Sequence, residues 1–199
     1  MALLYHNRRK SKSLMYRQFN GFTVFLQNCK NLRNTSETAG SEWLLYSSGI
    51  MHGTTFNDLK NSRLKDVRFD WDAVMSFEGD TGPYVQNAHV RLCSIMRKAG
   101  YMVNIADVDM AQLSDDAAYS LINILSKKGK KILDAVAGDE PSVLAQYALE
   151  IAEAAHKFIH EDRVLGSAEE KSRLFLVQAT QIVLENVLDL LGLFPIRQM

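Results

Sequence analysis

Cysteine is scarce in this chain, and long apolar runs are missing. Of its 199 residues only Cys29 and Cys93 are cysteines, too few and too far apart to predict a disulfide framework or a zinc site. No apolar stretch approaches the roughly 20 residues of a membrane-spanning helix, so we expect no membrane partner. With 47% hydrophobic and 23% charged residues, the composition predicts one well-packed domain with a smaller appendage.

The sequence also lacks the common signatures of nucleotide chemistry and nucleophilic catalysis. It contains no G-x-x-x-x-G-K-S/T loop and no G-x-G-x-x-G after a strand, and no serine stands in a nucleophile elbow. His156 and His160 lie one helical turn apart and suit a metal ion, but no third ligand accompanies them. We therefore predict no catalytic and no metal-ligating residue.

Charge is balanced overall but unevenly distributed. Residues 1–36 contain basic side chains and no acidic one, whereas residues 77–199 carry 17 acidic and 12 basic side chains. Counterion release from RNA phosphates needs clustered Lys and Arg. One cluster of this kind contains Lys127, Lys128, Lys130 and Lys131. It is either a phosphate-binding patch or a solvated junction between helices.

The chain is predicted to have three regions. Residues 1–56 form an irregular basic extension with one strand-like stretch, Gly21–Leu26. Residues 57–76 connect it to a helical domain at residues 77–199. The basic, acid-free start is compatible with mitochondrial targeting, but a disordered tail on a cytoplasmic protein is the preferred interpretation.

Apolar periodicity predicts about five helices, and hence an all-α, bundle-like domain. The first begins at Asp80-Thr81-Gly82-Pro83 and ends at Gly100. The remaining starts and stops are read from capping residues and prolines. Ser114 is predicted to cap the second helix, which ends near the lysines, and the third helix spans Lys131–Ala137. Pro141 begins the fourth helix. Ser167 and Glu170 form a capping box for the fifth, which ends at Gly192.

Four stretches, in order, resemble arginyl-tRNA synthetases, which are class I aminoacyl-tRNA synthetases. Phe77–Ile95 is similar to the family segment F-E-G-D/N-T-G-P-Y-L/V-Q-Y-A-H-x-R and departs from it chiefly at Asn87. The other three are Asn57–Trp71, similar to D-L-x-x-x-R-x-x-D-x-x-F-x-W; Glu140–Phe158, similar to E-P-x-x-L-x-x-Y; and the final V-L-E-N-V-L-D-L-L-G-L-F-P-I-R-Q-M. Together they cover roughly the last 140 residues.

The resemblance implies a helical anticodon-binding domain that reads unstacked bases of tRNA(Arg). Tyr84, Gln86 and Met199 match the family's tyrosine, glutamine and terminal methionine, and Arg91 is on the same helix as the first two. Asn87 replaces a second tyrosine, and Ile159 replaces a ring after the position that Phe158 matches. Tyr84 is alternatively a core residue at a helix start. The candidate RNA-binding residues are Tyr84, Gln86, Asn87, Arg91, Phe158 and Met199.

The family joins arginine to tRNA(Arg) with ATP and Mg²⁺, using an H-I-G-H-type signature that is missing here. We therefore expect a truncated arginine–tRNA ligase-like protein that binds tRNA(Arg), needs no cofactor of its own and does not aminoacylate alone. Two alternatives stay open. The domain is a non-catalytic interaction module that docks a partner, such as a full-length synthetase, or the chain is a gene remnant.

Overall fold

Every regular element in the described part of the chain is a helix, so the expectation of an all-α domain is confirmed there. The computed structural model describes residues 53–62 and 70–198; the predicted strand Gly21–Leu26 and most of the region 1–56 lie outside these ranges. Residues 53–59 are helical, and Phe56, assigned above to the irregular extension, is fully buried. The α-helices that follow are α3 (Trp71–Met75), α4 (Gly82–Ala99), α5 (Asp116–Ser126), α6 (Lys128–Gly138), α7 (Ser142–Glu161) and α8 (Glu170–Leu190).

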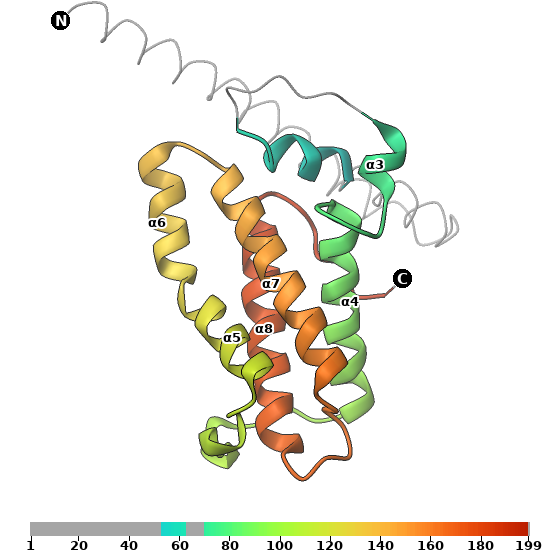
Figure 1. Cartoon of the computed structure of the whole chain (residues 1–199), viewed down its shortest axis with the longest axis vertical. Coiled ribbons are helices and arrows are strands. Elements are labelled where there is room, and N and C mark those ends of the chain that lie inside the picture. Colours follow the sequence, from blue (N-terminus) through green and yellow to red (C-terminus); the bar gives the residue numbers. More distant parts are fainter. Residues whose placement is uncertain (1–52, 63–69, 199) are drawn as a thin grey trace, which may run out of the picture. The chain divides into compact units, whose positions relative to one another are not determined.

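Helices α7 and α8 pack against each other and lie between α4 and the α5–α6 pair (Figure 1). Helix α4 contacts α7 and α8, whereas α5 and α6 pack mainly on α7. Two short 3₁₀ turns, η1 (Ile105–Asp107) and η2 (Met110–Gln112), connect α4 to α5 and touch α8. The bundle therefore has two outer sides, one made by α4 and one by α5 and α6.

The core is built from apolar stripes with helical spacing. On α7 the stripe includes Leu144, Tyr147, Ile151, Ala155 and Phe158, all buried. The hydroxyl of Tyr147 donates to the backbone oxygens of Ile124 (3.0 Å) and Leu125 (3.3 Å), so a core ring also satisfies carbonyls at the end of α5. Within residues 53–62 and 70–198 no helix combines the length and apolar character needed to cross a membrane.

Helix α4 begins and ends as predicted. The hydroxyl of Thr81 accepts a hydrogen bond from the backbone N–H of Tyr84 (3.1 Å), and Pro83 occupies the first turn, where it has no N–H to leave unpaired. Gly100 closes the helix at φ 75° with its N–H bonded to the oxygen of Met96. A side chain is unfavourable in this left-handed conformation, which explains why glycine stands there.

The predicted boundaries of the two middle helices are wrong by one to three residues. Asp115, not Ser114, precedes α5, and its carboxylate makes no cap bond because Arg173 takes it. Helix α6 begins at Lys128 rather than Lys131, and it ends at Gly138, followed by Asp139 with a left-handed φ of 49°. The lysines are thus the junction of two helices.

The predicted capping box of α8 does not form. The hydroxyl of Ser167 donates to the backbone oxygen of Val164, and the carboxylate of Glu170 accepts from the N–H of Gly166 and from the hydroxyl of Tyr101 (2.6 Å). Helix α8 consequently starts at Glu170, with Glu169 before it. Two local backbone groups and one distant hydroxyl therefore take the side chains that the predicted cap needed.

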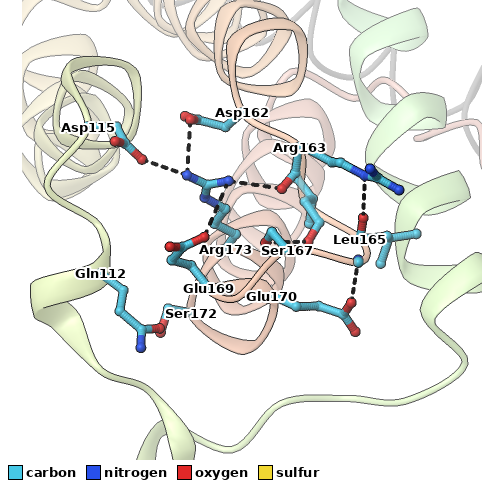
Figure 2. A network of polar contacts seen from close by, with 12 residues as sticks. Gln112, Asp115, Asp162, Arg163, Leu165, Ser167, Glu169, Glu170, Ser172 and Arg173 are labelled. Atoms are coloured by element: carbon cyan, nitrogen blue, oxygen red, sulfur yellow. Dashed lines mark hydrogen bonds and ion pairs between the residues drawn. The ribbon is translucent and has the colours of Figure 1, made fainter.

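Arg173 ties the start of α8 to the end of α7 and to α5 (Figure 2). Its guanidinium lies 2.9 Å from the carboxylate of Asp115 and 3.3 Å from that of Asp162, and it donates to the backbone oxygen of Arg163 (3.0 Å). Burial, followed by the charge of Asp115, raises the pKa of Asp162, and Arg173 opposes this rise. One cation therefore keeps two neighbouring carboxylates together.

Replacing Arg173 with Met should destabilise the fold by about 3 kcal/mol, because Asp162, whose side chain is only 10% exposed, loses its cation. Urea unfolding measures this change. Glu169→Gln is the matched control: that carboxylate is 3.8 Å from Arg173 and 37% exposed, so the loss should be below about 1 kcal/mol. Equal losses in the two variants would contradict the assignment.

Candidate nucleic-acid interface

The C-terminal segment, residues 193–198, has no regular structure and is held on α4 by a buried glutamine. Gln86 is 2% exposed. Its amide nitrogen donates to the backbone oxygen of Phe194 (3.0 Å), and its amide oxygen accepts from the N–H of Ile196 (2.9 Å). One side chain therefore satisfies two backbone groups of an irregular segment that lacks a helix or strand partner.

His89 and Arg97 continue this attachment along α4. His89 is fully buried, and its Nδ1 lies 2.7 Å from the oxygen of Ile196, so Nδ1 carries the proton and donates. Arg97 donates to the backbone oxygen of Arg197 (2.9 Å). The guanidinium of Arg197 in turn pairs with Glu185 of α8 at 2.9 Å. The end of the chain is thereby fixed between α4 and α8.

A hollow of about 460 Å³ lies beside this segment. Its lining comes from α4, α8 and the chain end: Cys93, Arg97, Gln181, Arg197 and Gln198. Two guanidinium groups and two amides present N–H donors there, which suit phosphate oxygens or acceptor atoms on base edges.

A second polar group joins α4 to α7. The ring centroids of Tyr84 and His156 are 4.9 Å apart at 46°, and Nη1 of Arg91 lies 3.0 Å from Nδ1 of His156. Burial, followed by the charge of Arg91, lowers the pKa of His156, and Nδ1 of the neutral ring accepts from Arg91. Tyr84 is half-buried and Arg91 is exposed, so an aromatic ring and a cation lie together at the edge of the bundle.

The candidate RNA-binding residues occupy different environments. Tyr84, Asn87 and Arg91 share one face of α4 and are at least partly accessible. Gln86, expected outside the buried stripe, is buried, and both ends of its amide are used by the chain itself. Phe158 is fully buried in the core and has no free ring face for a base; its stripe position on α7 already indicated this. Met199 lies outside the described residues.

Sequence reasoning missed the row that holds the chain end. Gln86, His89 and Arg97 lie on one side of α4, three and then eight residues apart, directly beside the apolar stripe. A row of polar residues against a buried face needs buried partners. That spacing was a usable signal, although it could not identify residues 194–197 as the partners.

Gln86→Met should cost about 2 kcal/mol, because the side-chain volume is kept while the oxygen of Phe194 and the N–H of Ile196 lose their partners. Urea unfolding gives the energy, and hydrogen exchange at the Ile196 amide reports local release. Gln146→Met, on the exposed face of α7, removes only a long, exposed bond of 3.3 Å to the backbone oxygen of Lys60, so it should change stability by no more than about 0.5 kcal/mol. Unaltered exchange at Ile196 would contradict the attachment.

The attachment should weaken in acid. Burial lowers the pKa of His89, and the charge of Arg197 adds to this; together they outweigh the bond to Ile196 and the charges of Glu185 and Asp189, which raise it. The unfolded chain therefore binds the proton more readily, and stability is lost as the pH falls below about 6.5. His156 acts in the same direction, so the comparison needs a variant. Urea unfolding at pH 7.5 and at pH 5.5 gives the decrease in unfolding free energy between the two. This decrease should be smaller in His89→Gln than in the unmodified chain. His160→Gln, at an exposed position, should leave the decrease unchanged.

Comparison with known proteins gives one consistent family. The model of the DALR anticodon binding domain matches residues 85–199. An arginine–tRNA ligase of Clostridioides difficile is 37% identical over 168 residues, which is 83% of this chain and 28% of that protein. One of Alkaliphilus metalliredigens is 42% identical over 141 residues, or 69% of this chain and 25% of that protein. The chain therefore spans about a quarter of the length of these curated relatives.

Solved structures give the same result. The structure of Thermus thermophilus arginyl-tRNA synthetase aligns with a TM-score of 0.73 and 28% identity, over 89% of this chain and 31% of that protein. That of Plasmodium falciparum arginyl-tRNA synthetase aligns with a TM-score of 0.71 and 25% identity. The matched family model covers more than half of the chain, and the chain therefore belongs to the DALR anticodon binding domain family, in the form that arginyl-tRNA synthetases carry.

Proposed function

We propose that this chain binds tRNA through the anticodon stem and loop, and that its cognate molecule is tRNA(Arg). The family match over residues 85–199 is the observation that carries the proposal. Relatives named arginine–tRNA ligase support the choice of tRNA. The binding surface proposed is the outer side of α4, together with the neighbouring edge of α7 and the chain end.

Tyr84 and Arg91 are the proposed contacts at the α4–α7 edge. Loop bases of RNA are recognised when they unstack onto aromatic rings or guanidinium planes. The ring of Tyr84 is held by His156 and the guanidinium of Arg91 is held by the same histidine, so both groups are pre-positioned. Asn87, half-buried between them on α4, offers an amide for a base edge.

The chain end supplies the other proposed contact. Gln86 and His89 act here as positioning residues, since they fix residues 194–196 without facing outward. The segment continues to Gln198, which lines the hollow together with Arg97 and Arg197. These guanidinium groups suit phosphate or base acceptors. The excess of 17 acidic over 12 basic side chains in residues 77–199 should keep affinity modest and dependent on salt.

Aminoacylation is not part of the proposal. ATP and Mg²⁺ serve the adenylation step of the family, and that step uses a histidine signature of the H-x-G-H type. The 199 residues contain no such tetrapeptide. We therefore assign binding of tRNA, without ligation of arginine, to this chain on its own.

The test is a binding titration of the purified chain with tRNA(Arg), the same tRNA with an altered anticodon, and an unrelated tRNA, repeated at several salt concentrations. The cognate tRNA should bind most tightly. Tyr84→Ala should weaken this binding about tenfold, because stacking of one base contributes roughly 1–3 kcal/mol. The preference among the three tRNAs should fall with it.

Tyr119→Ala is the matched control, because this tyrosine is 69% exposed on α5, on the other side of α7 and α8. It should leave all three affinities unchanged. Circular dichroism and urea unfolding establish that each variant is folded. Equal binding of all three tRNAs at low salt would reject the proposal.

A further inference from the structure

Helices α5 and α6 form one nearly continuous rod. Lys127, the single residue between them, has helical torsion angles, φ −81° and ψ −3°, and its oxygen accepts from the N–H of Lys131 (2.9 Å). Both helices pack on α7, and Tyr147 of α7 bonds to the carbonyls at their junction. The two helices therefore keep a common inner side, marked by buried Leu121 and Ala135.

Four large apolar side chains follow the rod on another side. Tyr119, Ile122, Leu133 and Val136 are 69%, 36%, 69% and 70% exposed. Tyr119 and Ile122 are about one helical turn apart on α5, and Leu133 and Val136 are about one turn apart on α6. About three turns separate Ile122 from Leu133. We call these four residues the α5–α6 stripe. The stripe is thus two apolar pairs, with exposed Ser126, Gly129 and Lys130 between them, and paired apolar residues of this size are unlike the isolated exposed ones common on protein surfaces.

Lysines lie at the middle of the stripe. Lys127 and Lys130 are exposed and form no ion pair in the described part of the chain, whereas Lys131 pairs with Glu150 at 2.7 Å. The helical region as a whole has more acidic than basic side chains. These lysines are therefore a local positive site between the two apolar pairs.

We infer that the α5–α6 stripe docks an amphipathic helix of a partner protein, with an apolar face and flanking Asp or Glu side chains. The apolar face covers the two ends of the stripe, and the carboxylates meet Lys127 and Lys130 between them. The stripe spans about 25 Å, so the partner helix has about five turns. This function is additional to RNA binding, because the stripe is separated from α4 by α7 and α8.

Other occupants fit the surface less well. Single-stranded RNA needs rings for base stacking, but three of the four stripe residues are aliphatic. A second copy of the chain in a two-fold arrangement would place the same surface on both sides. Lys127 and Lys130 would then face their counterparts, and like charges repel.

The probe is a synthetic helical peptide of about five turns, with leucines on one face and glutamates beside them, titrated into the full chain by fluorescence anisotropy. It should bind, and added salt should weaken the binding. Leu133→Asp and Val136→Asp should each reduce affinity about tenfold or more, because a buried apolar contact is lost. Lys130→Glu should reduce it and remove most of the salt dependence. Ile105→Asp, at a 65% exposed residue outside the stripe, is the control and should have no effect.

Four results would overturn the inference. The first is no binding of the peptide, and the second is equal binding of a peptide with lysines in place of the glutamates. The third is self-association of the unmodified chain, measured by sedimentation and abolished by Leu133→Asp, which would identify a second copy as the occupant. The fourth is loss of tRNA binding in Leu133→Asp, which would identify RNA.

Discussion

The last residues of the chain must satisfy their backbone hydrogen bonds without a helix or strand, and the amide of Gln86 is the group on which this depends. It bonds to Phe194 and Ile196 at once, and His89 adds a second bond to Ile196. The side chains of Gln86 and His89 are buried, and an unpaired polar group is costly in such a place. The geometry of the hollow and the direction of the chain end both follow from this single attachment.

Helix α4 carries two separate polar sites. Tyr84 and Arg91 face α7, where His156 holds them, while Gln86, His89 and Arg97 face the chain end. The two sets lie on opposite flanks of the buried apolar stripe of α4. An aromatic ring at one place and guanidinium groups at another are the chemistry that an unstacked RNA loop requires.

Sequence reasoning found the elements controlled by local chemistry. Thr81, Pro83 and Gly100 bound α4 where their side chains and torsions require it, and periodicity placed Phe158 in the core stripe of α7. It failed where distant residues compete. Asp115 is drawn to Arg173, so a local cap was assigned to the wrong residue. For Phe158 the family resemblance suggested an RNA contact, and its burial agrees instead with the periodicity.

The partner of Gln86 could not be identified in the same way, since Ile196 is 110 residues away and no spacing rule connects them. That separation has a consequence for the order of folding. Closing so long a loop has a large entropic cost, so the contact forms late compared with the local turns of α4. During synthesis α4 is complete long before residues 194–196 leave the ribosome. Until then, Gln86 and His89 have no chain end to bond, and the α4 side of the bundle cannot reach its final packing.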